Sequence, residues 1–282
     1  MIPRTVFIVA GVTLQEAARR RVLRSLAVLT IALLGLSAWG FARLDAEFGG
    51  LTTGESRIAA STVLNLVMFG LSLIAALGTA FLAGPTLAGE VESGVSLAVF
   101  ARPVRRSAVL LGKWLGLVVF GSGYVAIAGL AQCLVVFLTV DYWPPQPAAA
   151  MALLATQTIV LLTLGLLLSA VISPMASGVV AVGLFGATWV AGVVGGIGEA
   201  LGNDGVARVG TLSRILLPTD GLWRGAMHAL QDSSAFTQLG AERAAFPFIS
   251  AAPLTATYLA WAALWVAMVW GLAALTFQRR DL

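Results

Sequence analysis

Long apolar runs dominate the chain, and short polar connections separate them. A helix that crosses a bilayer needs about 20 mostly apolar residues, because the hydrocarbon core is about 30 Å thick and a helix rises about 1.5 Å per residue. Six runs meet this length, near Val22–Leu44, Ser61–Gly84, Ala108–Val140, Ala149–Ile172, Met175–Ile197 and Leu254–Phe277. The pattern predicts an all-α, polytopic membrane protein with six transmembrane helices, and residues 1–282 form one transmembrane domain.

Two of these runs have informative ends. The third is longer than a span needs, so we expect its first turns to project into the cytoplasm. The fourth and fifth would form one overlong run without the break "ISPMAS". Pro174 disfavours a helical conformation at Ser173, so the break predicts a tight turn between two helices.

Two further segments have helical spacing without the length of a span. The first segment, residues 1–21, is predicted to be an interfacial helix. Its amphipathic part spans Thr5–Arg20, and its basic end would face anionic lipid headgroups. Residues 198–253 form a segment too long for a bare loop. Helical spacing on both sides of Pro218 predicts two short extracytoplasmic helices that lie on or dip into the outer leaflet. Thr219 is a candidate cap for the second helix.

Composition and charge support a membrane protein and predict its orientation. Hydrophobic residues make up 59% of the chain and charged residues 11%, against about 25% in soluble domains. With both termini in the cytoplasm, 11 of the 17 Lys and Arg residues lie inside and 9 of the 13 acids lie outside. The positive-inside rule favours this orientation. The net charge of +4 is therefore a feature of membrane topology, and we expect no nucleic-acid partner.

One short stretch resembles a nucleotide-binding motif but lacks its essential residues. The Gly-Lys pair in "LGK" at Leu111–Lys113 would need a glycine where Ser107 stands and a hydroxyl where Trp114 stands. The phosphate cradle is therefore missing. A Gly-x-Gly at the end of the fifth run has no strand before it, so Gly192 and Gly196 indicate close helix packing instead.

The chain offers no other cluster of reactive groups. We interpret His228, the single histidine, as a surface residue, although a weak site with Asp232 one turn later stays open. Cys133 reads as a small buried hydrophobe. We predict no catalytic residue, no metal site and no directly bound cofactor, so the chain is not an enzyme. No carboxylate lies deep inside a span, which argues against ion-coupled transport. Three uncharged polar residues there can bridge helices or touch a substrate: Asn65, Gln132 and Gln157.

The densest charge lies in residues 85–107, the main cytoplasmic connection between the second and third spans. Glu90 and Glu92 come first, then one or two helical turns that Pro103 ends, then Arg105 and Arg106. Such a short element between two spans can dock on a partner protein. Its charged residues would fix its alignment on the partner, and its apolar residues would be buried in the interface. An ordinary positive-inside loop is the alternative.

This connection resembles that of ABC-2-type permeases, the membrane subunits of type V ABC exporters. The resemblance rests on Glu90, Glu92, Gly94, Ser96–Leu97, "RPVRR" at Arg102–Arg106 and "LGK" at Leu111–Lys113. The stretch "TLQEAARRRVL" at Thr13–Leu23 is similar to the family's connecting helix, and "FQRRDL" at Phe277–Leu282 to its C-terminal ending. Six spans and a long segment between the fifth and sixth also match, so the resemblance covers essentially the whole chain.

The resemblance implies a half-transporter in the inner membrane of a prokaryote. It would form a homodimer or a related heterodimer and pair with cytoplasmic ABC ATPase subunits that bind ATP and Mg²⁺, with export as the expected direction. The ATPase-coupling residues would be Glu90, Glu92, Gly94, Leu97, Phe100, Arg102, Pro103, Arg105 and Arg106. The substrate path would lie at the dimer axis, lined by Asn65, Met68 and Phe69 of the second span and Phe185, Thr188 and Trp189 of the fifth.

A second, narrower resemblance suggests an alternative function. The stretch "LLPTDGLWR" at Leu216–Arg224 is similar to that of permeases linked with nitrous oxide reductase maturation. On this alternative the chain is an ATP-driven membrane scaffold that transmits motion to an extracytoplasmic partner, without classical solute transport. Residues 198–253 would then be the contact surface.

Overall fold

The computed structural model describes residues 2–19, 21–48, 54–92, 105–231, 247–250 and 252–279. Every regular element in these ranges is a helix, which confirms the all-α prediction. The helices are α1 (Ile2–Arg19), α2 (Arg21–Phe48), α3 (Gly54–Glu92), α5 (Arg106–Val140), α6 (Pro147–Ser169), α7 (Pro174–Ala200), α8 (Asp204–Leu216), α9 (Thr219–Leu230) and α11 (Ala256–Arg279).

Among the described residues, six helices are long and apolar enough to cross a membrane: α2, α3, α5, α6, α7 and α11. Four of them contain a predicted apolar run, whereas α6 ends three residues before the fourth run does and α11 begins two residues after the start of the sixth. The six spans are therefore confirmed by length and composition. The turn between the fourth and fifth spans is also confirmed, because Ser173 is extended and Pro174 is the first residue of α7.

The candidate second span, Arg57–Thr86, ends close to the predicted position, but its helix continues. We placed its end near Gly84, but α3 continues through Pro85 to Glu92. A proline is tolerated inside a membrane helix, because neighbouring helices and side chains can satisfy the backbone groups that it frees. The first part of the connection predicted over residues 85–107 is therefore helical.

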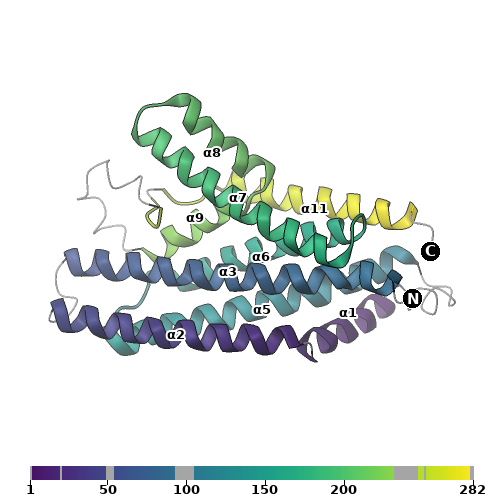
Figure 1. Cartoon of the computed structure of the whole chain (residues 1–282), viewed down its shortest axis with the longest axis horizontal. Helices are drawn as coiled ribbons and strands as arrows, with labels where there is room; N and C mark the ends of the chain where they lie inside the picture. The colour runs from purple at the N-terminus through teal and green to yellow at the C-terminus, as the bar shows by residue number, and fades with distance from the viewer. Residues whose placement is uncertain are drawn as a thin grey trace.

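Both termini lie at the same end of an elongated bundle (Figure 1). We call this the terminal end. Helices α2, α3, α5 and α6 run along the bundle, whereas α7 diverges from it and pairs with α8 as a hairpin. Helix α9 packs against α6, and α11 returns along α6 toward the terminal end.

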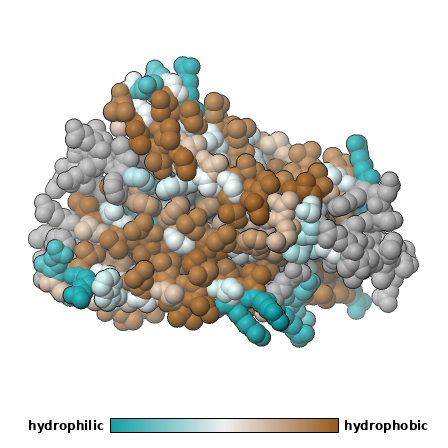
Figure 2. Space-filling model, viewed as in Figure 1, coloured by the Kyte–Doolittle hydropathy of each residue, from teal (hydrophilic) through white to brown (hydrophobic). Residues whose placement is uncertain are grey.

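The outer surface of the bundle is largely apolar (Figure 2). Large side chains such as Ile31 on α2 and Ile127 on α5 are 69% and 74% exposed. An exposed apolar surface of this extent is unfavourable in water but matches the hydrocarbon of a bilayer. On the visible face, hydrophilic side chains gather at the ends of helices and where α1 meets α2.

Helix α1 confirms that the predicted N-terminal segment is helical and shows what it packs against. A Cβ at Gly112 of α5 would lie 2.7 Å from the Cβ of Val9, and one at Gly116 would lie 2.6 Å from the carbonyl oxygen of Ala10. Glycines one turn apart thus form the surface on which α1 sits. Phe7 on the other side of α1 is 72% exposed. The placement of α1 at a membrane interface stays a prediction.

Candidate functional site: the helix ends around the α3–α5 connection

The predicted coupling element lies mostly outside the described residues. Gly94, Leu97, Phe100, Arg102 and Pro103 are not described, nor are the side chains of Glu90 and Glu92 in the last turn of α3. Their role in docking stays a prediction. The structure does describe the helix ends on both sides of the connection, and these form a polar contact network at the terminal end.

Lys113 ties the two flanking helices together. It lies two turns into α5 and is only 5% exposed, and its ammonium donates to the backbone carbonyl of Thr86 near the end of α3 at 2.8 Å. A buried ammonium in a membrane protein needs such a partner, because its desolvation is costly. The lysine of the "LGK" stretch is thus a structural link beneath the connection.

Further contacts extend this network to α6, α7 and α11. The hydroxyl of Ser169, the last residue of α6, donates to the carbonyl of Gly84 at 2.6 Å. Gly84 also faces the Pro174 carbonyl so closely that a Cβ there would collide with it. Arg106, half-buried at the start of α5, donates to the carbonyl of Gln278 in the last turn of α11 at 3.2 Å. The ends of four helices and the α6–α7 turn are therefore linked around the connection.

The predicted path residues come together where α3 packs on α7. Phe69 of α3 stacks on Trp189 of α7, with ring centroids 4.6 Å apart and an interplanar angle of 29°. Trp223 of α9 and Phe248 complete the aromatic cluster, with centroids 5.4 and 5.7 Å from that of Phe69. The sequence analysis missed these last two residues, because both lie in the segment between the fifth and sixth spans.

The other four path residues are buried within the single chain. Met68 on α3 is 0% exposed, and Phe185 and Thr188 on α7 are 2% and 8% exposed. The Asn65 amide donates to the Phe248 carbonyl at 2.9 Å, while its buried oxygen has no partner among the described residues. In one chain these residues therefore form a packed contact, and their exposure to a path at a dimer axis stays a prediction.

The two glutamines within the spans bridge helices. Gln132 on α5 donates to the hydroxyl of Ser37 on α2 at 2.6 Å. The carbonyl oxygen of Gln157 on α6 accepts a bond from Ser72 on α3 at 3.0 Å. The sequence left open whether these residues link helices or touch a substrate, and the contacts favour the first role.

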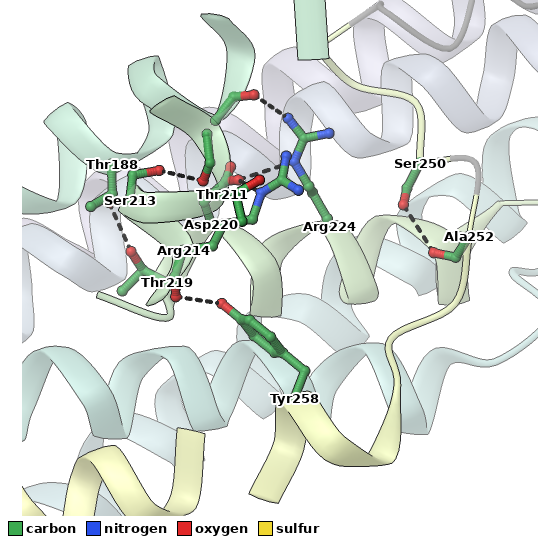
Figure 3. A network of polar contacts seen from close by, with 12 residues as sticks. Thr188, Thr211, Ser213, Arg214, Thr219, Asp220, Arg224, Ser250, Ala252 and Tyr258 are labelled. Carbon is green, nitrogen blue, oxygen red and sulfur yellow. Dashed lines mark hydrogen bonds and ion pairs between the residues drawn. The ribbon is translucent and has the colours of Figure 1, made fainter. Parts of the chain in front are cut away.

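The structure also contains a buried ion network between α7, α8 and α9, which sequence reasoning missed (Figure 3). The Asp220 carboxylate is 2% exposed, and one of its oxygens accepts bonds from Nε of Arg214 and Nε of Arg224, both at 3.0 Å. Arg224 also donates to the carbonyl of Gly192 on α7 at 2.7 Å. A Cβ at Gly192 would collide with the carboxylate, so only glycine fits this close approach.

Thr219 has a different partner from the one predicted. We proposed it as the cap of the second short helix, but Pro218 is the N-cap residue and Thr219 is already helical. Its hydroxyl instead shares a hydrogen bond with that of Thr188 on α7 at 2.9 Å (Figure 3). The sequence pattern was right about two short helices, α8 and α9, but wrong about this cap.

Helix α11 supplies the donors that satisfy the last turn of α8. Tyr258, Trp261 and Trp265 donate to the consecutive carbonyls of Arg214, Ile215 and Leu216 at 3.0, 3.2 and 2.8 Å. Helix C-termini leave such carbonyls without intrahelical partners. The three donors follow one face of α11, so α8, α9 and α11 form a single polar junction.

The single histidine and the single cysteine have ordinary structural environments. His228 is half-buried on α9, with Nδ1 3.3 Å from the carbonyl oxygen of Ser250. Asp232, its candidate partner, lies outside the described residues. Cys133 is fully buried, as predicted. Within the described ranges no three His, Cys, Asp or Glu residues lie together in a way that could hold a metal ion.

The comparisons with known proteins agree with this architecture. No curated protein matches the chain with significant similarity. Residues 15–282 match the family described as "ABC-2 family transporter protein". The matched region includes every helix from α2 to α11 and therefore all six candidate spans. On this coverage, the chain belongs to the ABC-2 family and is a membrane-embedded permease component of an ABC transporter.

Proposed function

We propose that the chain is the permease of an ABC exporter that dimerises and couples to separate cytoplasmic ATPase subunits. ATP and Mg²⁺ would bind to those subunits, and the chain itself would bind no cofactor. The observation that carries the proposal is the link between Lys113 and Thr86 beneath the α3–α5 connection. Family membership supplies the transporter class, and this link supplies a physical route for coupling.

The helix ends around the connection favour transmission of a mechanical displacement. A force on residues 94–103 would reach α3 and α5 together, because Lys113 joins them directly. The contacts of Gly84 with Ser169 and of Arg106 with Gln278 would pass it on to α6 and α11. Closure of the ATPases would therefore move these helices as a unit, which is the rigid-body type of switch.

The proposed substrate path runs between α3 and α7 at the dimer axis. The stacked pair Phe69 and Trp189 lies at this contact, and packing of this kind can exchange between two discrete arrangements. The side chains available to a substrate on this route are aromatic and apolar, apart from Asn65 and Thr188. An apolar or amphipathic substrate fits such a lining better than a small ion does.

A pair of charge reversals tests the coupling. Arg105→Glu changes an exposed residue at the start of α5, and Arg208→Glu makes the same change on an exposed residue of α8 as a matched control. In the reconstituted complex with its ATPase, Arg105→Glu and Glu90→Ala should abolish substrate-stimulated ATP hydrolysis, whereas Arg208→Glu should leave it intact. Thermal unfolding of the permease should be unchanged in all three. Normal stimulation in Arg105→Glu and Glu90→Ala would refute the coupling assignment.

The ordered α8–α9 unit favours the mechanical alternative in one respect. The ion network holds α8 in place on one side. On the other side of α8, Leu212 and Leu216 are 59% and 74% exposed. These side chains could meet a soluble partner as well as lipid. Crosslinking from Leu212→Cys to an extracytoplasmic protein, with no solute movement in sealed vesicles, would support the scaffold function. Solute export without such a partner would contradict it.

A further inference from the structure

An apolar groove of about 450 Å³ lies between α2 and α5. Its walls are two helical faces of matching length: Leu23, Ala27, Thr30, Ile31 and Leu34 on α2, and Phe120, Gly123, Tyr124, Ile127, Ala128 and Ala131 on α5. Ile31 and Ile127 at its rim are largely exposed, so the groove opens on the outer surface of the bundle. A Cβ at Gly123 would meet nothing within 4 Å.

The polar groups of the groove are already satisfied within the chain. The hydroxyls of Thr30 and Tyr124 bond to each other across the two helices, and Thr30 is also within 2.7 Å of the Leu26 carbonyl oxygen. Because buried polar groups that are paired offer nothing to a polar ligand, the lining selects for an apolar one. Both walls belong to membrane-spanning helices, so the surrounding medium is hydrocarbon.

The length of the groove matches one leaflet. Leu23 and Leu34 are eleven residues apart along α2, and a helix rises about 1.5 Å per residue, so the groove is about 16 Å long. The hydrocarbon core is about 30 Å thick, so this length is about half of it. The groove runs parallel to the helices, which is the direction of a lipid acyl chain.

One end of the groove carries a positive charge. Arg24 follows Leu23 and lies in a row with Ala27 and Ile31 at helical spacing, so it stands at the mouth of the groove near the α1–α2 junction. Hydrophilic side chains gather at this junction in Figure 2. Arg24 is exposed and forms no ion pair with another described residue. Arginine near a membrane surface attracts anionic lipid headgroups.

We propose that this groove binds an anionic phospholipid, with one acyl chain along α2 and α5 and the phosphate at Arg24. The lipid fills a surface that the chain leaves open beside α1. It therefore acts as a bound structural partner of the first and third spans, apart from the α3–α7 contact proposed as the substrate path. The inference does not depend on the direction of transport or on the identity of the substrate.

Photocrosslinking of the full-length chain locates the lipid. The probe is phosphatidylglycerol with a photoreactive acyl chain, present as a minor component of phosphatidylcholine nanodiscs. The crosslinks should concentrate on peptides from residues 23–34 and 120–131. Gly123→Leu fills the groove and should remove these crosslinks, whereas Gly183→Leu on α7, where a Cβ also meets open space, should retain them. Labelling spread evenly over all spans, or a second copy of the chain crosslinked at this face in place of lipid, would overturn the proposal.

Headgroup selectivity is tested separately, in case Gly123→Leu disturbs folding. Native mass spectrometry should show that the chain retains phosphatidylglycerol in preference to phosphatidylcholine of the same chain length. Arg24→Gln should weaken this retention about fivefold. Arg21→Gln is the control, because Arg21 is also exposed but lies roughly 140° around α2 from the groove. Equal retention of phosphatidylglycerol by Arg24→Gln and Arg21→Gln would contradict headgroup binding at Arg24 and overturn the proposal.

Discussion

Neutralising Asp220 tests whether the buried ion network holds α7, α8 and α9 together. Asp220→Asn keeps the shape of the side chain and one acceptor oxygen, but it removes the negative charge and replaces the other oxygen by an NH2 donor. Two arginines then remain in contact with a neutral partner, each about one-fifth exposed. We expect this substitution to destabilise the fold far more than a surface Asp→Asn change does.

The expected magnitude follows from the contacts. Each Arg–carboxylate bond of 3.0 Å is a charged hydrogen bond, which contributes about 2 kcal/mol, whereas its neutral counterpart contributes about 1 kcal/mol. Loss of the counter-charge between two close arginines adds about 1 kcal/mol, which brings the total to about 3 kcal/mol, at the low end of the cost of breaking a buried pair. At about 2–4 °C per kcal/mol for a chain of this size, the unfolding midpoint should fall by about 6–12 °C.

The assay is thermal unfolding in one detergent at one scan rate, because membrane proteins often unfold irreversibly. Asp204→Asn is the matched control, since Asp204 is exposed in the first turn of α8 and forms no described ion pair. Combining Asp220→Asn with Arg214→Gln should cost less than the sum of the single changes, because the double variant has one fewer uncompensated cation. If Asp220→Asn unfolds at the same temperature as Asp204→Asn, the network does not stabilise the fold and the reasoning is refuted.

Three further substitutions test other contacts. Gly112→Leu should displace α1 and expose it to protease, because its Cβ has no room, while Gly40→Leu on α2, where the space is open, should not. Lys113→Met should lower the unfolding midpoint, because the Thr86 carbonyl loses its buried donor, and it should also reduce substrate-stimulated ATP hydrolysis in the complex. Trp265→Phe removes the donor to the Leu216 carbonyl and should cost about 1–3 kcal/mol, measured as a lower unfolding midpoint.

The spans were predictable because a membrane helix is a local signal. About 20 apolar residues in sequence identify one without knowledge of its neighbours. Helix ends were less predictable, as two prolines illustrate. Pro174 begins α7 after the extended Ser173, whereas Pro85 lies within α3 and the helix continues for seven more residues. The difference depends on what packs against each proline, and the sequence does not contain that information in local form.

The candidate path was predictable only in part. The resemblance named Phe69 of the second span and Trp189 of the fifth as path residues, and the structure shows that these two side chains touch. Trp223 and Phe248 lie in the same cluster, but no periodic pattern marked them, because residues outside the apolar runs carry no signal for packing against a span. Long-range contacts of this kind depend on where the connecting segment folds back.

The ion network bears directly on the charge rule that predicted the orientation. That rule counted Arg214 and Arg224 as free outer cations and Asp220 as a free outer acid, but the three form one buried unit. The spacing of these residues indicated such a unit. An aspartate with one arginine six residues before it and another four residues after it can bind both when the chain turns at Pro218.

Charges that bind each other inside the fold do not interact with the membrane surface. Lys113 on the inner side is buried as well. Setting these residues aside leaves ten inner and four outer cations, compared with 11 and six before. The bias of Lys and Arg toward the inside, which predicts cytoplasmic termini, is therefore larger once the buried charges are excluded.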